Sequence, residues 1–154
     1  MTLLRGLMIA VLLAPAGVRA AAAQSAADSA AIRAAAMDYI EGYYTGDGPR
    51  MERALHPELA KRIVRTDSAT KRSQLQQMSA MSLVMGTRMG GGSQTPVAER
   101  RTDYRLLDIY RGAAVAKVVA SSWIDYLQLA KWNGEWRIVN VLWELTPPGE
   151  HPKP

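Results

Sequence analysis

The spacing of apolar residues divides the chain into an N-terminal part with a helical period and a C-terminal part with the period of β-strands. In residues 25–45 an apolar residue returns to the same face every three or four positions, which predicts an amphipathic helix. Asp28 and Ser29 are suited to cap its start. The inward face of this helix is formed by Ile32, Ala36, Tyr39 and Tyr43.

Two further helices are expected before residue 90. Asp47 and Pro49 can start a short helix that runs through Leu55, because Asp is a favourable N-cap and Pro fits the first turn. Pro57 ends it, since a residue before proline avoids the helical region. Residues 58–65 are compatible with a short strand or with another helical turn. A third helix is predicted over 73–89, with Leu75, Met78, Ser82, Met85 and Met89 on one side and a flexible glycine-rich loop at 86–93.

The rest of the chain alternates apolar and polar residues with a period of two. Asn133-Gly134 predicts a tight hairpin between the last two strands. The final strand is apolar on both faces, which indicates that it is covered on both sides. Helices followed by an antiparallel meander indicate an α+β fold with the helices on one face of a curved sheet. Strands are expected over 103–110, 113–121, 123–132 and 136–145, followed by a disordered proline-rich tail at 146–154.

The N-terminal residues have the pattern of a secretory signal peptide. Arg5 supplies a positive charge, Leu7 to Ala16 is nearly all apolar, and Ala20 to Ala23 offers small-residue cleavage sites. The apolar run is shorter than a membrane span requires, although an uncleaved anchor is the alternative. We therefore expect a signal peptide over 1–23 and an exported domain over 24–145, periplasmic or secreted and free of the membrane after cleavage.

Composition and charge narrow the possible chemistry. The absence of Cys excludes disulfides, thiol catalysis and zinc-thiolate sites, and the absence of Phe leaves Tyr, Trp and Met to fill the bulky interior positions. The formal net charge of +5 includes two arginines of the predicted leader. No nucleic-acid recognition motif accompanies the basic residues, so no nucleic-acid partner is expected. No metal and no cofactor are expected either. We interpret one basic cluster as a solvated face: Lys61, Arg62, Arg65, Lys71 and Arg72.

Several segments together resemble a known family. They are Ala31 to Gly42, the run Arg53 to Arg62 with its Leu-His-Pro, Val115 to Val119, Trp123 to Lys131, and Gly134 to Trp143. Over roughly 28–145 the chain resembles the putative lumazine-binding branch of the nuclear transport factor 2-like superfamily. The resemblance implies a cone-like fold, in which three N-terminal helices pack in the concave face of a curved, mostly antiparallel sheet. It also implies a pocket between them and a homodimer formed through the sheet.

Two residues are candidates for acid–base chemistry. His56 is suited to act as a base, or else to close the second helix by meeting its free carbonyls. Asp125 is suited to act as a base or a raised-pKa acid on a pocket-facing strand, or else to pair with Lys117 or Arg137 on a neighbouring strand. Its neighbour Tyr126 points to the opposite face.

Other residues are candidates for ligand binding. Tyr39 and Tyr43 either offer hydroxyls to a ligand or pack the core with their hydroxyls at the rim. The methionines, Met78 and Met85 among them, fill the core, form a soft pocket wall, or supply thioethers to Cu(I). Trp123 and Trp143 provide flat aromatic surfaces for the core or the pocket.

Three hypotheses of function follow. The first is an exported, non-catalytic domain that holds an apolar or flat heterocyclic small molecule in the pocket of the cone. The second is an acid–base enzyme of the isomerase or dehydratase type, as in the dehydratases, isomerases and polyketide cyclases of the superfamily, with His56 or Asp125 as base and a tyrosine as donor. The third is a homodimeric interaction module whose own side chains fill the pocket.

Overall fold

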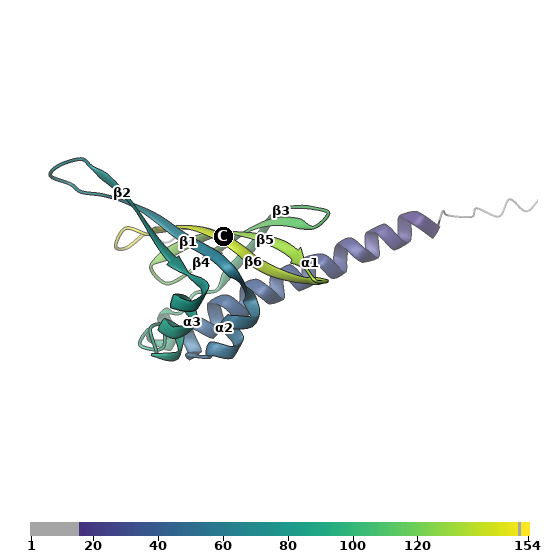
Figure 1. Cartoon of the computed structure of the whole chain (residues 1–154), viewed down its shortest axis with the longest axis horizontal. Coiled ribbons are helices and arrows are strands. Elements are labelled where there is room, and N and C mark those ends of the chain that lie inside the picture. Colours follow the sequence, from purple (N-terminus) through teal and green to yellow (C-terminus); the bar gives the residue numbers. More distant parts are fainter. Residues whose placement is uncertain (1–15, 151) are drawn as a thin grey trace, which may run out of the picture.

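The computed structural model describes residues 16–150 and 152–154, with side chains from residue 26 onward. The predicted leader lies partly outside these residues. The described chain forms three α-helices, one 3-10 turn and a six-stranded sheet (Figure 1). In chain order these are α1 (Ala16–Thr45), α2 (Gly48–Ala54), β1 (Leu55–Thr66), β2 (Ser73–Ser79), α3 (Ala80–Arg88), the 3-10 turn (Val97–Glu99), β3 (Asp103–Tyr110), β4 (Ala113–Val119), β5 (Trp123–Trp132) and β6 (Glu135–Leu145).

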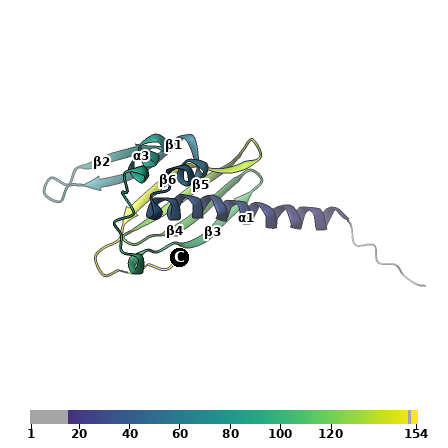
Figure 2. The same ribbon diagram turned by 90° about the horizontal axis from the view of Figure 1, so that it is seen from below.

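The strands follow the order β2-β1-β6-β5-β4-β3, and every neighbouring pair is antiparallel except β1 and β6. All three helices lie on one side of the curved sheet (Figures 1 and 2). The predicted α+β cone is therefore confirmed. None of the helices that the structure describes combines the length and hydropathy that a membrane crossing requires.

The core lies between α1 and the concave face of the sheet. Ile32 and Ala36 of α1 are fully buried, as the helical period predicted, and Ile40, which was not predicted, is fully buried beside them. Across from them, alternate residues of the central strands are fully or almost fully buried, and each large one contributes about 1.5–3 kcal/mol by leaving water. These residues are Ala116, Val118, Leu127, Leu129, Ile138 and Val141.

The helix α1 begins earlier than predicted, so Asp28 is an interior helical residue and not a cap. Its carboxylate accepts hydrogen bonds from Lys131 Nζ at 2.7 Å and from Trp136 Nε1 at 3.0 Å, and these bonds tie the helix to the β5–β6 hairpin. The N-terminal half of α1 projects beyond the sheet (Figure 2).

The prediction of one helix over 73–89 is wrong, because residues 73–79 form the edge strand β2. Ser79 ends this strand and caps α3 by exchanging hydrogen bonds with Ser82. The predicted methionine stripe is also wrong here, since Met85 of α3 and Met89 at its C-cap are 45% and 78% exposed, and Met81 at the edge of the stripe is 69% exposed. The buried side of α3 is instead formed by Ala80, Val84 and Thr87. Core packing is thus excluded for these three methionines.

Residues 58–65, which the sequence left open, belong to β1. This strand starts directly after α2, and its pairing with β6 shifts between Leu55 and Ala60. The irregular stretch contains Pro57, which has no N–H to donate to a ladder. His56 therefore lies at the beginning of a strand and does not close the helix, whose C-cap is Leu55.

β6 contains a bulge that reverses its alternation. Gln128 pairs with Asn140 and the next residue of β5 pairs with Ile138, so Val139 is an extra residue. Ile138 before the bulge and Val141 after it therefore face the helices together. Coverage of β6 on both sides is not observed, because Leu142 is 52% exposed on the outer face.

The C-terminal tail contacts the strands at one side of the sheet. The carbonyl oxygen of Pro152 accepts a hydrogen bond from Arg101 Nη2 at 3.0 Å, and that of Lys153 accepts one from Lys117 Nζ at 2.5 Å. These contacts place the last described residues beside β3 and β4.

Candidate functional site

A cavity of about 360 Å³ opens between α1, α3 and the concave face of the sheet. Five of the residues predicted to bind a ligand line it together, although they come from α1, β2, β5 and β6. They are Tyr39, Tyr43, Met78, Trp123 and Trp143. Ile40, Met51 and Leu83 complete an apolar wall. The interaction-module hypothesis, in which the chain's own side chains fill the pocket, does not fit this open volume.

One charged residue, Lys61 of β1, lines the cavity. Its Nζ lies 2.6 Å from Asp125 Oδ1, and the two side chains are only 6% and 0% exposed. A buried ion pair of this kind is stable only where its remaining donors and acceptors are also satisfied. The surrounding residues meet that requirement at Asp125.

Tyr39 and Trp123 complete the hydrogen bonding of the Asp125 carboxylate. Tyr39 OH donates to Oδ2 at 3.0 Å, and Trp123 Nε1 donates to the same oxygen at 2.7 Å. Lys61 Nζ also donates to Tyr39 OH at 2.6 Å. Burial, and then the negative charge of Asp125, raise the pKa of Tyr39 well above its ordinary value. Tyr39 is therefore a neutral phenol at physiological pH.

Aromatic rings surround the Lys61 ammonium. Nζ lies 4.8 Å from the ring centre of Trp143, 5.3 Å from that of Tyr39 and 5.9 Å from that of Trp123. These distances allow cation–π attraction, which is strongest for a desolvated cation. An ammonium has three N–H donors, and the described side chains accept two of them. The third is available to an acceptor in the cavity.

The role of Lys61 corrects two expectations. The residue is buried and does not belong to a solvated basic face. It is also the partner of Asp125, in place of Lys117 or Arg137. The sequence contains a signal for this position, because Lys61 stands between Leu59 and Ile63, which share its face of β1 and are both buried.

Three predicted site residues lie outside the cavity wall. Asp125 lies behind Tyr39 and Trp123 and is fully buried. Met85 is 45% exposed on the outer side of α3. His56 stacks edge-on against Trp132 with ring centres 4.6 Å apart, and its Nδ1 accepts a hydrogen bond from the backbone N–H of Glu58 at 3.2 Å. The structure thus does not bring His56 to the other candidates.

The glycine-rich loop forms the support behind Tyr43. A Cβ added at Gly92 would lie 2.4 Å from Tyr43 Cδ1 and 2.5 Å from the Tyr43 carbonyl oxygen. The loop is held by Arg100, whose Nε and Nη2 donate to the carbonyl oxygens of Thr95 and Ser93. The glycine-rich loop therefore forms a hydrogen-bonded turn that packs against one wall of the cavity.

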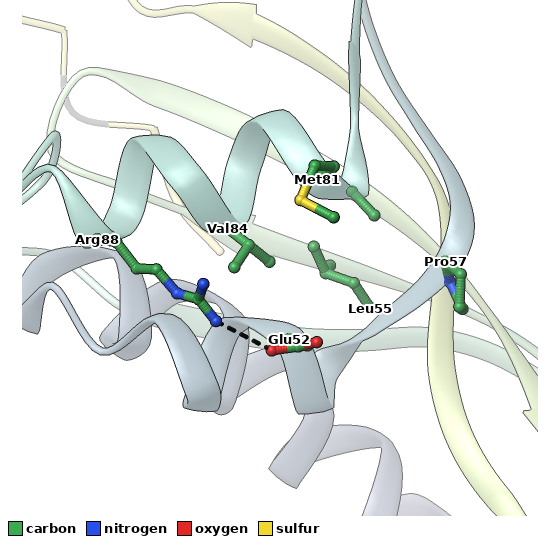
Figure 3. Close-up of a pocket in the computed structure, with 7 residues that line it drawn as sticks. Glu52, Leu55, Pro57, Met81, Val84 and Arg88 are labelled. Atoms are coloured by element: carbon green, nitrogen blue, oxygen red, sulfur yellow. Dashed lines mark hydrogen bonds and ion pairs between the residues drawn. The ribbon is translucent and has the colours of Figure 1, made fainter.

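A second, smaller hollow of about 190 Å³ lies between α2, the start of β1 and α3 (Figure 3). Leu55, Val84 and Met81 line it, and Arg88 bonds Glu52 across its edge at 3.3 Å. Both charges of that pair are exposed, so no buried polar group faces a ligand there. Among the described residues no group of three or more His, Cys, Asp or Glu is placed to hold a metal ion.

A cone of three helices in a curved sheet, with a cavity at its centre, defines a class of small α+β proteins that present one interior site. The chain belongs to the family described as "Putative lumazine-binding", which matches residues 27–144. No curated protein matches the chain.

Solved structures of the same fold are distant in sequence. An NTF-2-like protein of unknown function from Silicibacter pomeroyi is 16% identical, covers 79% of this chain and 98% of its own, and has a TM-score of 0.62. An NTF2-like protein with a cystatin-like fold from Novosphingobium aromaticivorans is 10% identical, with coverages of 89% and 94% and a TM-score of 0.64. A hexachlorocyclohexane dehydrochlorinase, LinA Type2, is 11% identical, with coverages of 84% and 99% and a TM-score of 0.51. At these identities the similarity shows the NTF2-like fold.

Proposed function

We propose that this protein is a non-catalytic small-molecule-binding protein whose ligand occupies the cavity lined by Tyr39, Lys61 and Trp143. The observation that supports this most strongly is the fixed position of Lys61, whose ammonium is held by buried partners and keeps one donor for the cavity. Few polar groups in an otherwise apolar cavity are typical of small-molecule sites, where they orient the ligand. The name of the family supports the same class of function.

The lining favours a flat, uncharged heterocycle with an acceptor at its edge. Trp123, Trp143 and Tyr43 offer aromatic surfaces, and Lys61 offers the donor. The charge of Lys61 is already balanced by Asp125 at 2.6 Å. A ligand carboxylate at this position would place a second negative charge in a desolvated site, so a carbonyl oxygen or a ring nitrogen fits better.

Native mass spectrometry of the protein purified from its own host tests this proposal. We expect one flat organic molecule per chain, released when the protein unfolds. Replacement of Met78, which lines the cavity, by Trp should reduce the ligand-bound fraction, whereas Met85→Trp on the outer side of α3 should not. A retained molecule that is unaffected by Met78→Trp would contradict the assignment of the cavity.

One observation favours the enzyme hypothesis, because Asp125 and Tyr39 lie within hydrogen-bond distance. However, the Asp125 carboxylate already accepts three hydrogen bonds and is fully buried, so it has no free lone pair directed at a substrate. The raised pKa of Tyr39 also opposes its use as a base. We therefore assign Asp125 to the positioning of Lys61. Solvent deuterium incorporated into a bound ligand's C–H position would reverse this assignment.

We propose further that the protein is exported, on the basis of Arg5, the apolar run Leu7 to Ala16 and the small residues Ala20 to Ala23. The cut would fall within α1, so the mature helix would begin near residue 24. N-terminal sequencing of the protein from the periplasm or medium tests this. A full-length chain that stays with the membrane fraction would contradict it.

We also propose that two copies associate through the outer face of the sheet. Tyr126 and Leu142 are cross-strand neighbours there and are 42% and 52% exposed. Beside them, Arg62 Nη1 donates to Asn140 Oδ1 at 2.7 Å and Asn140 Nδ2 donates to Gln128 Oε1 at 3.0 Å. Exposed apolar pairs next to an ordered polar row support an interface with a second copy.

A further inference from the structure

We propose that Lys61 binds carbonyl ligands covalently, through an imine between its Nζ and the carbonyl carbon of an aldehyde or ketone held in the cavity. This inference rests on the proposed function, because the ligand must first occupy the cavity. Lys61 is the one lysine that is buried in the described part of the chain. The other described lysines are exposed or half-buried: Lys71, Lys117, Lys131 and Lys153.

The position of Nζ suits attack on a bound carbonyl. Two of its three hydrogen-bonding directions point to Asp125 and Tyr39, which leaves one direction toward the cavity. Lysine amines that are desolvated in apolar pockets are the ones that form imines in proteins. The apolar wall of Ile40, Met51 and Leu83 also limits the access of water that would hydrolyse the product.

The buried partners allow the proton transfers that the reaction requires. The ammonium first passes a proton to Asp125 Oδ1 at 2.6 Å, and the free amine forms the C–N bond with the carbonyl carbon. The carbonyl oxygen takes a proton from nitrogen to give a carbinolamine. Asp125 then returns its proton through Tyr39, which bonds the carboxylate and lines the cavity, to the hydroxyl, which leaves as water while nitrogen forms the C=N bond. The sum is one carbonyl and one ammonium converted into one iminium and one water, with the Asp125 carboxylate restored.

The product keeps the charge distribution of the empty site. An iminium carries one positive charge, as the ammonium does, and Asp125 remains its counter-ion. The rings of Trp143, Tyr39 and Trp123 surround this position at 4.8, 5.3 and 5.9 Å and stabilise a cation of either kind. The site therefore loses no ion pair when the covalent bond forms, whereas an exposed lysine gains no such stabilisation.

Reductive trapping tests the proposal. The full-length protein is incubated with 2-naphthaldehyde and sodium cyanoborohydride, and the alkylated lysines are located by peptide mass spectrometry. We expect Lys61 to be alkylated at least about tenfold faster than the exposed Lys71, because binding in the cavity holds the carbonyl beside Nζ. 2-Naphthalenemethanol, which has the same ring and no carbonyl, should slow labelling of Lys61 by competition and leave that of Lys71 unchanged.

Two variants separate the chemistry from the fold. Lys61→Arg keeps a cation beside Asp125 and cannot form an imine, so selective labelling should disappear. In the Lys71→Arg variant, Lys61 should be labelled at the same rate as in the natural protein. If Lys61→Arg does not fold, the competition experiment on the natural protein decides alone.

The outcomes distinguish this inference from the proposed function. Binding of 2-naphthalenemethanol, seen as quenched tryptophan fluorescence, together with no preference for Lys61 would overturn the covalent step and leave the cavity as a binding site. If neither naphthalene compound binds, both the covalent step and the binding of flat bicyclic ligands in the cavity are overturned. If the alcohol does not slow the labelling of Lys61, binding in the cavity is not the cause of that labelling.

Discussion

At the scale of single residues, the stability of the protein's interior depends on the ion pair between Lys61 and Asp125. Each is buried, and each would be a costly unpaired charge without the other. The bonds from Tyr39 and Trp123 satisfy the rest of the carboxylate, so residues of α1, β1 and β5 form one network. The ion pair between Arg88 and Glu52 differs from it, because those side chains are 49% and 68% exposed and water screens them.

This contrast predicts the effect of removing one charge. Lys61→Met should lower the free energy of unfolding by about 3–5 kcal/mol, because it leaves Asp125 buried without its partner. Lys61→Met combined with Asp125→Asn should recover most of that loss. Arg88→Met should cost less than about 1 kcal/mol. Urea denaturation of the three variants measures these differences, and equal losses for Lys61→Met and Arg88→Met would refute the role of the network.

The pKa of Tyr39 predicts a decline in stability at alkaline pH. Its folded pKa is raised, so the folded state keeps the phenolic proton at pH values where the unfolded state has lost it. The stabilisation that comes from the retained Tyr39 proton is fully present below pH about 10, the ordinary pKa of tyrosine. It is lost as the pH rises through the pKa of Tyr39 in the folded state. Urea denaturation between pH about 9 and 11 measures the slope. Tyr39→Phe should make it shallower, and Tyr126→Phe, at an exposed position, should leave it unchanged.

Sequence reasoning identified the aromatic members of the site and missed its cation. Tyr39 and Tyr43 follow from the helical period of α1 alone. Lys61 did not, since lysine is rarely buried and the segment around it was left open between strand and helix. Once β1 is a strand, the alternation of Leu59, Lys61 and Ile63 places the lysine inside.

At the scale of elements, local pattern predicted the long helix and the hairpins but not the irregularities that shape the cavity. The bulge at Val139 directs Val141 and Trp143 to the face that Ile138 occupies. Simple alternation puts Trp143 and Ile138 on opposite faces, and nothing in the local sequence marks the extra residue. β2 was also hidden, because its pairing with β1 overrides a sequence that is compatible with a helix.

The loop behind Tyr43 leads to a prediction about glycine. Gly92→Ala should destabilise the protein and weaken ligand binding, because its methyl group would collide with the Tyr43 ring and backbone. Gly86→Ala is a matched control within α3, where a Cβ meets no atom within 4 Å. It should stabilise the protein by up to about 1 kcal/mol, since alanine is the better helix former. Thermal unfolding compares the two, and similar melting temperatures would show that the loop does not support Tyr43.

At the scale of the whole molecule, the helices cover the concave face of the sheet, and none of the described helices lies on its outer face (Figure 1). The general architecture followed from the order of helices and strands together with the resemblance to a family. The parallel pairing of β1 and β6 did not, because that contact joins segments far apart in the chain. The exposed pair of Tyr126 and Leu142 is likewise visible only after the sheet is assembled.

The proposed homodimer predicts a change of mass in solution. The natural protein should have the mass of two chains by light scattering coupled to gel filtration. Leu142→Lys should shift it toward one chain, because two copies would bury the new charges against each other. Met81→Lys, at a position that is 69% exposed on the helical side, should leave the dimer intact. A single-chain mass for the natural protein at high concentration would exclude this interface.

A calorimetric titration with lumazine tests most directly whether the cavity beside Lys61 binds a flat small molecule. Trp143 lines the cavity, whereas Trp132 is 53% exposed at the end of β5. We predict that the natural protein binds lumazine, that Trp143→Leu weakens binding about tenfold or more, and that Trp132→Leu leaves it within about twofold. No binding heat from the natural protein, or equal losses in the two variants, would contradict the account.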